Sequence, residues 1–530
     1  MNRFSPAGFY PYLWSVCSAF AAALALSFEW AYPLAFLCMV PLFGTLSRAG
    51  GLLRGAGIGF TWGFVFAAAV GYGVFFALHD HYGKSAFFSL LFMTGFVLVP
   101  AGILYGIVGA ACRFLYRDTM AFFALVAPSV LVLCEYLREI LPGMIPWGGL
   151  GYSLTASPLL LQTADTWGQY GLSWILFCIN GLVWAAISGM VRSRRLTGGE
   201  DAYRTPQSSI KALLPAGIAV LALALLCTYG GIALNRWRSP ERAGGGGAPG
   251  IQAVIAQASH GQRERWRDDS FYARLESYLA LSGAPAGEGR MIVWPETVLN
   301  SPRRLQPALF ARLAQAAGEN GVLLSGGVRH AAGGEFNAVW TISGDGETSS
   351  YDKHILLPFA ETAPLESGGL GAYYEAPSRF EPGTGPLTVS TVHGKVGTSI
   401  CFELLYGDFI RQSVRGGAGI LVNVSNDAWF GDSNMPRIHA RAAAMRAVEE
   451  RRYVLRASNS GISAVVAPSG DVFAQTALFS REALRAEIHA LDTDTVFARA
   501  GYWVVYASIL IVMGALVRML ARGGATGTPS

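Results

Sequence analysis

The sequence predicts a membrane-embedded bundle of about eight helical spans joined to an α/β sandwich domain, and three observations support this prediction. Of the 530 residues, 52% are hydrophobic and only 14% are charged, whereas about 25% are charged in a typical soluble protein. Long apolar runs fill the first 235 residues and return near the C-terminus. Between them, short β-branched runs alternate with amphipathic stretches, a pattern that indicates an α/β domain.

The eight apolar runs are each close to the ~20 residues that a helix needs to cross a bilayer. They cover about 9–27, 30–47, 54–78, 86–114, 120–137, 168–190, 212–233 and 500–520. We therefore expect a transmembrane domain with seven helices over 1–235, a linker over 236–250, and the α/β domain over 251–495. Residues 496–530 should form the eighth transmembrane helix and a short cytoplasmic tail.

Basic residues in the short loops predict the orientation of the spans. Twelve Lys and Arg residues fall on one side and six on the other, with most of the six flanking the large polar segment. Both termini should then be cytoplasmic. Segment 234–499 should lie outside the inner (cytoplasmic) membrane, in the periplasm of a Gram-negative cell. The formal charge of +5 forms no basic face, so nothing indicates a nucleic-acid partner.

One loop between the apolar runs is unusual in composition. GMIPWGGLGYS (143–153) contains Pro146, Trp147 and four glycines, too few apolar residues to span. Two interpretations remain open: a re-entrant loop that lines a lipid access route, or an aromatic anchor at the membrane interface. Glu135, near the end of the fifth run, receives no role.

The polar segment begins with the glycine-rich stretch RAGGGGAPG (242–250), which is typical of a flexible linker. Strands are then predicted over 251–257, 291–296, 321–327, 337–343, 387–392, 395–401, 419–425, 452–458 and 463–470. Helices are predicted over about 266–282, 304–319, 407–416 and 436–451. Glu296 and Cys401 each close one of these strands, where α/β folds place their chemistry.

Cys401 is the only cysteine of the polar segment, because the other six lie in apolar runs. A disulfide within this segment is thus excluded, and thiol–disulfide chemistry is not indicated. A thiol with an upstream Glu and Lys indicates a nucleophile, a base and a charge for an oxyanion. We assign these roles to Cys401, Glu296 and Lys353, with the Phe402 N–H as a second oxyanion donor. The histidines of the segment lack zinc spacing, so neither a metal nor a cofactor is predicted.

Four motifs extend this pattern: VWPET, YDKHILLPFAE, TSICFE and VSNDAWFGDS. Together they resemble the nitrilase superfamily, whose catalytic set is Glu–Lys–Cys. With eight spans around the domain, the chain is similar to the apolipoprotein N-acyltransferase branch over essentially its whole length. The resemblance implies an αββα sandwich on a membrane base. It also implies transfer of an acyl chain from a phospholipid, phosphatidylethanolamine in the typical case, through a cysteine thioester. The acceptor would be the N-terminal amine of a diacylglyceryl-cysteine apolipoprotein, the last step of bacterial lipoprotein maturation.

The resemblance also implies supporting residues. Glu361 and Glu403 match family glutamates, and either direct chemistry or structural ion pairing would account for them. The substrate-contact candidates are Trp266, Trp429 and Phe430, with domain core as the alternative. Phe402 stands where the family often has tyrosine, so a hydroxyl there is not expected to be essential. The stretch ESGGLGAYYE (366–375) is interpreted either as a lid or as an ordered surface loop.

Two other functions remain as alternatives. A membrane-tethered amidase of the nitrilase type would share the Glu–Lys–Cys set, but it would hydrolyse a small amide and would need neither eight spans nor the WFGDS motif. A non-catalytic lipid carrier would be expected to have lost at least one of the three residues.

Overall fold

Two units make up the chain, and each has its own core. Unit 1 comprises residues 1–232 with 502–530, and unit 2 comprises 233–501. The computed structural model describes residues 6–196, 206–239, 250–261, 267–283, 289–301, 304–362, 380–385 and 387–524. Most of the predicted linker, Trp266, and the stretch 366–375 lie outside these described residues. The predicted boundaries at 235, 250 and 495 stay predictions.

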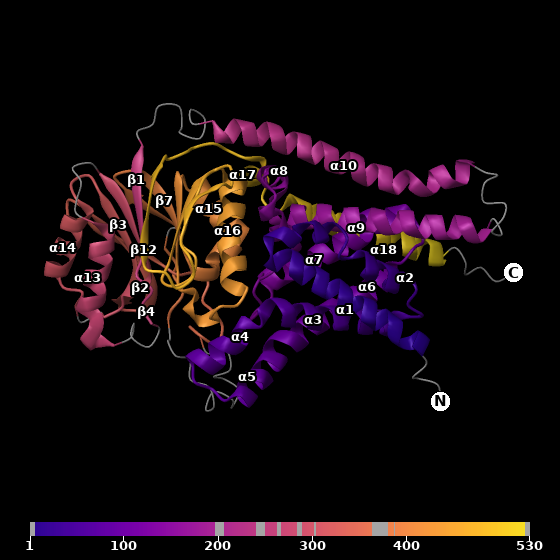
Figure 1. Ribbon diagram of the computed structural model, residues 1–530, viewed down its shortest axis with the longest axis horizontal. Coiled ribbons are helices and arrows are strands. Elements are labelled where there is room, and N and C mark those ends of the chain that lie inside the picture. Colours follow the sequence, from indigo (N-terminus) through magenta and orange to yellow (C-terminus); the bar gives the residue numbers. More distant parts are fainter. Residues whose placement is uncertain are drawn as a thin grey trace. The chain divides into compact units, whose positions relative to one another are not determined.

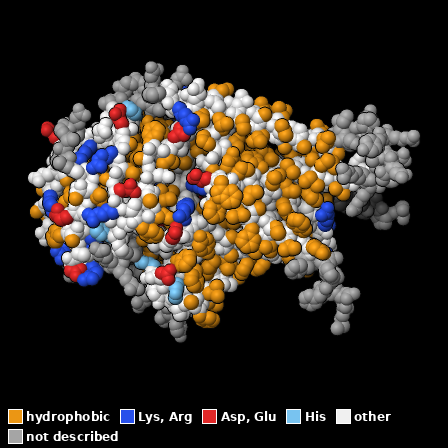
Figure 2. Space-filling view, in the orientation of Figure 1, with side chains coloured by type: hydrophobic (Ala, Val, Ile, Leu, Met, Phe, Trp, Pro, Cys, Tyr) orange, Lys and Arg blue, Asp and Glu red, His pale blue; other side chains and the backbone are white. Residues whose placement is uncertain are grey.

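Unit 1 is helical. Its main helices are α1 (Pro6–Ser27), α3 (Leu52–Gly71), α6 (Val99–Leu115), α7 (Ala127–Ile140), α9 (Ala164–Leu196), α10 (Pro206–Arg238) and α18 (Trp503–Gly524). Shorter helices are η1 (Glu29–Phe36), α2 (Val40–Ser47), α4 (Gly73–Phe76), η2 (Ala77–His81), α5 (Ala86–Met93), η3 (Thr94–Leu98), η4 (Phe122–Val126), η5 (Leu150–Ala156) and α8 (Pro158–Leu161). Figure 2 shows hydrophobic side chains over most of the visible face of these helices, as a surface in contact with lipid requires.

Small residues bring the helices of unit 1 close together. A methyl group on Gly59 of α3 would overlap the Tyr105 carbonyl of α6, and one on Gly109 would overlap the Gly55 carbonyl. Lipid tails are as apolar as leucine, so membrane helices associate through this kind of close packing. The glycines of the third and fourth apolar runs thus specify a tight α3–α6 pair.

Seven helices in the described part of the chain are long and apolar enough to cross a membrane, one fewer than the predicted number of spans. The run predicted over 120–137 is the one that differs. It forms η4 followed by α7, whose last two turns contain Glu135, Arg138 and Glu139. These charges reduce its hydropathy, and α7 is short at 14 residues.

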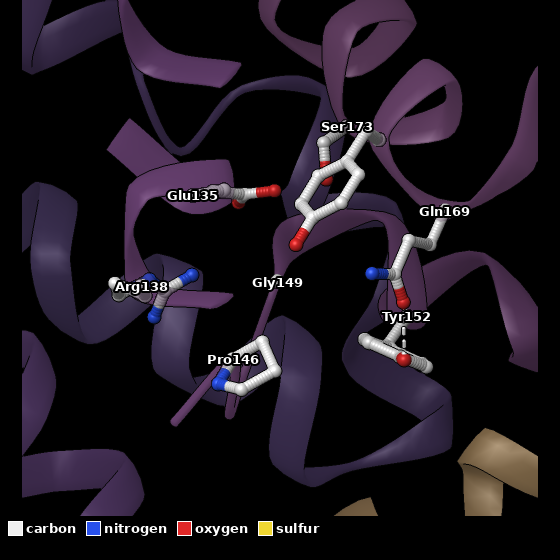
Figure 3. Close-up of a pocket in the computed structure, with 8 residues that line it drawn as sticks. Glu135, Arg138, Pro146, Gly149, Tyr152, Gln169 and Ser173 are labelled. Atoms are coloured by element: carbon white, nitrogen blue, oxygen red, sulfur yellow. Dashed lines mark hydrogen bonds between the residues drawn. The ribbon is translucent and has the colours of Figure 1, made fainter. Parts of the chain in front are cut away.

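The loop at 143–153 folds into unit 1 and meets these charges. The Glu135 carboxylate accepts the Leu150 N–H at 2.8 Å, at the start of η5, and Arg138 donates to the Trp147 carbonyl at 2.9 Å. Figure 3 shows both side chains around a small cavity that Pro146 and Gly149 also line. Glu135 therefore holds this loop in place. Whether the loop admits lipid or anchors the interface stays a prediction.

Unit 2 contains two six-stranded sheets. The first has the order β12-β1-β2-β3-β4-β5 and the second β11-β10-β9-β8-β7-β6. The strands are β1 (Ile251–Gln257), β2 (Arg290–Leu299), β3 (Val322–Ala331), β4 (Gly334–Ser343), β5 (Thr348–Asp352), β6 (Thr388–Thr391), β7 (Gly394–Ile400), β8 (Ile420–Ser425), β9 (Tyr453–Ser458), β10 (Ala464–Val466), β11 (Val472–Gln475) and β12 (Glu482–Ile488). The central pairs β1–β2, β2–β3, β7–β8 and β8–β9 are parallel, and the outer pairs are antiparallel.

Helices cover the outer face of each sheet, so the unit has four layers (Figure 1). Helices α13 (Phe271–Ser282) and α14 (Pro307–Ala317) cover the first sheet, and α15 (Gly407–Arg415) and α16 (Met435–Glu450) cover the second. Short helices η6 (Asp268–Ser270), η10 (Cys401–Leu405), η11 (Asp427–Phe430) and α17 (Val496–Ala500) complete the unit. The inner core joins both sheets through residues such as Val293, Val322, Val422 and Leu455. The predicted αββα sandwich is confirmed.

Three strands were not predicted from the sequence, and each has a physical reason. β5 (TSSYD) is a polar edge strand. β11 is four residues long and mostly exposed. β12 (EALRAEI) consists largely of strong helix formers, yet it pairs along its whole length with β1. The helix propensity of this segment is overridden because pairing with β1 satisfies backbone groups at an otherwise open edge of the sheet.

Candidate active site

The strand β7 delivers Cys401 to a sharp turn. The strand ends at Ile400, and Cys401 begins η10 in the left-handed backbone region, with φ of 55°. Only glycine adopts this region without strain, and strained backbone is concentrated at functional sites. The turn leaves the Cys401 side chain partly accessible, although its neighbours Ile400 and Phe402 are buried.

Glu296 and Lys353 come from the other sheet. Glu296 lies in β2 where the pairing with β3 becomes irregular, and the next residue, Thr297, also has a positive φ of 57°. Gly326 of β3 faces this point, where any side chain would overlap the Glu296 backbone. Lys353 follows directly after β5 and is 1% exposed. The sandwich thus brings together groups that the sequence separates by about a hundred residues.

Lys353 lies between two carboxylates. Its Nζ is 2.8 Å from Glu361 Oε2 and 3.7 Å from Glu296 Oε1. Asn337 of β4 joins both acids, because its Nδ2 donates to Glu296 Oε1 at 2.8 Å and to Glu361 Oε1 at 2.7 Å. All four side chains are at least nine-tenths buried. Asn337 was not predicted from the sequence, which offered only a polar residue at the start of the strand NAVWTIS.

The charges around Cys401 determine its resting protonation state. Burial and the Glu296 charge raise the pKa of the thiol to about 12, and Lys353 offsets only part of this increase. Burial by itself would lower the pKa of Lys353, but Glu361 and Glu296 raise it above its ordinary value. At neutral pH the lysine is therefore charged and the cysteine is a thiol, so the cysteine needs a proton acceptor before it can attack.

Glu403 has a different environment from Glu361. Its carboxylate accepts the backbone N–H groups of His354, Ile355 and Ile400 at 2.7–3.0 Å and the Tyr351 hydroxyl at 2.8 Å. It is fully buried, and burial raises its pKa. These bonds join the end of β7 to the segment after Lys353. Glu403 thereby fixes the position of Cys401 relative to Lys353.

Phe402 contributes its ring. Lys353 Nζ lies 5.1 Å from the centroid of the Phe402 ring, within the range of a cation–π contact. This contact involves the ring face and needs no hydroxyl. That a hydroxyl is dispensable at this position stays a prediction.

A buried polar network lies behind Cys401, and its members were not predicted. Asn423 Nδ2 donates to the Cys401 carbonyl at 3.1 Å, and His439 Nε2 lies 3.2 Å from the same oxygen. Asp427 Oδ1 is 2.9 Å from His439 Nδ1, and its Oδ2 accepts from Arg456 at 2.6 Å. All four residues are fully or almost fully buried. Asn423 and Arg456 were visible in the sequence only as a polar residue inside the apolar strands GILVNVS and YVLRAS.

The charged groups of this network shift one another's pKa values. Burial by itself would raise the pKa of Asp427, but Arg456 and His439 hold it well below its ordinary value. Burial and the Arg456 charge lower the pKa of His439. A carboxylate–guanidinium pair therefore anchors His439 and Asn423, which in turn hold the strained peptide at Cys401.

The predicted substrate-contact residues are only partly visible. Trp429 and Phe430 end η11, just after Asp427, and both are partly exposed. Trp266 lies outside the described residues. Within the described residues, no three His, Cys, Asp or Glu side chains are grouped closely enough to hold a metal ion.

Comparison with known proteins matches both units. Residues 253–496 match the carbon-nitrogen hydrolase family model, and residues 18–182 match the apolipoprotein N-acyltransferase N-terminal domain. The apolipoprotein N-acyltransferase of Brucella suis is 30% identical over 427 residues, which cover 78% of this chain and 75% of that protein. The chain belongs to the apolipoprotein N-acyltransferase family. The resemblance inferred from the four motifs is therefore confirmed.

Other relatives extend the match over nearly the whole chain. The apolipoprotein N-acyltransferase of Geobacter metallireducens is 28% identical over 537 residues, covering 96% of this chain and 95% of its own. A CN-hydrolase superfamily protein from Xanthomonas campestris is similar at 17% identity over 46% of this chain and 91% of its own, with a TM-score of 0.35. Membership of the apolipoprotein N-acyltransferase family rests on the sequence matches. Together with the seven apolar helices, this membership identifies the chain as a membrane protein.

Proposed function

We propose that this protein transfers an acyl chain from a phospholipid to the N-terminal amine of a diacylglyceryl-cysteine apolipoprotein, through a thioester on Cys401. The supporting observation is the buried Lys353, held between Glu296 and Glu361 and close enough to Cys401 to change its pKa, in a chain of this family. The donor is phosphatidylethanolamine. The distribution of Lys and Arg between the loops supports a position in the bacterial inner membrane, with the sandwich on the periplasmic side.

In the first half of the reaction, Glu296 accepts the proton of the Cys401 thiol, and Sγ attacks the ester carbonyl of the phospholipid. The oxyanion that forms is stabilised by the charged Lys353 and by the Phe402 N–H. When the tetrahedral intermediate collapses, the C–O bond breaks. The leaving alkoxide takes the proton from Glu296 and departs as a lysophospholipid. An acyl thioester remains on Cys401.

In the second half, the amine of the apolipoprotein attacks the thioester carbonyl. Glu296 accepts a proton from the amine, the C–S bond breaks, and the thiolate recovers that proton. Glu361 keeps Lys353 charged and oriented. Glu403 positions Cys401 and Lys353 through its hydrogen bonds to the backbone on either side. Trp429, Phe430 and Trp266 contact the substrates. These roles are consistent with two sequential proton transfers at one carboxylate.

Intact mass spectrometry tests this proposal. Purified protein is incubated with phosphatidylethanolamine and no acceptor, as wild type, Cys401→Ala and Cys17→Ala. Cys17 is an exposed thiol in α1 and is the matched control. We expect a fatty-acyl increment on the wild type and on Cys17→Ala that hydroxylamine releases, and none on Cys401→Ala.

The absence of an increment on folded wild-type protein would contradict the acyltransferase reaction. Hydrolysis of a small amide by the same protein would then favour the amidase alternative. An increment that persisted in Cys401→Ala would show that another residue carries the acyl group.

A further inference from the structure

Glycines allow helix α10 to approach the rest of unit 1 closely at two points, one in each half. A methyl group on Gly189 of α9 would lie 3.4 Å from the Cα of Ala212 in α10. In the other half, a side chain at Gly230 of α10 would overlap the carbonyl of Leu159 in α8. Glycines of this kind allow close approach of membrane helices. Between these two contacts α9 and α10 run beside each other (Figure 1).

A groove of about 420 Å³ lies between the two contacts. Aromatic and aliphatic side chains form its walls, including Trp167, Trp174 and Ile179 from α9 and Ala222 and Leu225 from α10. Its volume is within the roughly 300–1,000 Å³ of small-molecule sites. Both walls belong to helices that are long and apolar enough to cross a membrane, so the groove opens to hydrocarbon.

Polar groups gather at one end of the groove. The Tyr229 hydroxyl donates to Asp165 Oδ1 at 2.7 Å and lies 3.4 Å from Thr166 Oγ1. Thr166, Tyr229 and Thr163 are part of the lining. These residues lie at the start of α9 and near residue 232, where the helical unit ends. The groove therefore has an apolar body and one polar end, as a molecule with a hydrocarbon tail and a polar head would require.

We propose that this groove binds one acyl chain of a phospholipid, with the head group at the Thr166–Tyr229 end. Water is not a suitable occupant, because apolar cavities stay dry. A helix from a partner is about 10 Å across with its side chains and would need several times this volume. The site is independent of the chemistry at Cys401, and it makes α10 a helix held in place partly by lipid.

Photocrosslinking tests the site. The full-length protein is reconstituted in vesicles that contain a phospholipid with a diazirine on its acyl chain, and labelled peptides are identified by mass spectrometry. We expect labelling to concentrate in 163–182 and 222–229. Ala222→Trp, which places an indole in the groove, should reduce this labelling at least threefold.

Two further variants make the result decisive. Val220→Trp adds the same ring to an exposed position of α10 that does not line the groove, and it should leave labelling unchanged. Leu225→Trp fills the groove at a second place, in case Ala222→Trp does not fold. Even labelling along the exposed face of α10, or equal labelling in the folded groove and control variants, would overturn the proposal and indicate only bulk lipid contact.

Discussion

Asn337 offers the sharpest test of how the active site is organised. Its Nδ2 hydrogen-bonds both Glu296 and Glu361, while its Oδ1 has no hydrogen-bond partner among the described residues. Replacement by leucine, which has nearly the same shape, therefore removes two hydrogen bonds to carboxylates. The backbone bond from Lys353 N to the Asn337 carbonyl, at 2.8 Å, is unaffected.

The expected magnitude follows from those two bonds. A hydrogen bond to a charged group contributes about 1.5–3 kcal/mol, and each ~1.4 kcal/mol in a barrier changes a rate about tenfold. Only the bond to Glu296 involves the proposed base. If that bond keeps the base oriented for proton transfer, Asn337→Leu should slow thioester formation by about 10- to 100-fold. Asn337→Asp should slow it further, because a third carboxylate would replace the donor.

The assay is single-turnover thioester formation followed by intact mass, together with thermal unfolding. Thr341→Val is the matched control: Thr341 is buried in the same strand, and its hydroxyl has no hydrogen-bond partner in the described structure. This variant should react at the wild-type rate. A folded Asn337→Leu protein that reacts at the wild-type rate, or a Thr341→Val protein that slows equally, would refute the reasoning.

Four further predictions concern protonation and buried charge. Glu296→Gln should lose thioester formation at neutral pH. In the wild-type protein the pKa of Cys401 is raised to about 12, so alkylation of its thiol by iodoacetamide should rise about tenfold per pH unit from 7 to 9. A flat profile would contradict this protonation state. Burial raises the pKa of Glu450 from its ordinary value of 4.5 to about 8, so between these two pH values the folded state holds a proton that the unfolded state has lost. The melting temperature should therefore fall as the pH rises from 5 to 8, and Glu450→Gln should reduce this dependence on pH. Asp427→Asn leaves the buried Arg456 without its carboxylate, which should lower the free energy of unfolding by about 3–5 kcal/mol. Denaturant titration measures this change, and unchanged stability would show that the pair does not anchor the structure.

Much of the fold was predictable because its signals are local. Apolar runs of about 20 residues locate membrane helices without any knowledge of their partners, and alternation of strand and helix patterns locates an α/β domain. The fifth run shows the limit. Its apolar residues are visible in the sequence, but Glu135 acquires a function only when the loop at 150 folds back onto it.

The candidate site divides in the same way. Cys401, Glu296 and Lys353 stand out because each is a reactive residue inside a recognisable motif. The sequence also placed Cys401 and Glu296 at strand ends, although β2 continues past Glu296 to Leu299. Asn337, Asn423 and Arg456 do not, because a polar residue inside an apolar strand has no partner visible in the sequence.

The sequence by itself determined the membrane and sandwich classes and most strands, and it singled out the three residues proposed for the reaction, because residue type and hydrophobic period are local signals. Only the tertiary structure decided that β12, a helix-forming segment, becomes a strand, and that Asn337 joins Glu296 to Glu361. The physical reason is that burial makes an unpaired sheet edge or carboxylate costly, and partners for both come from distant parts of the chain.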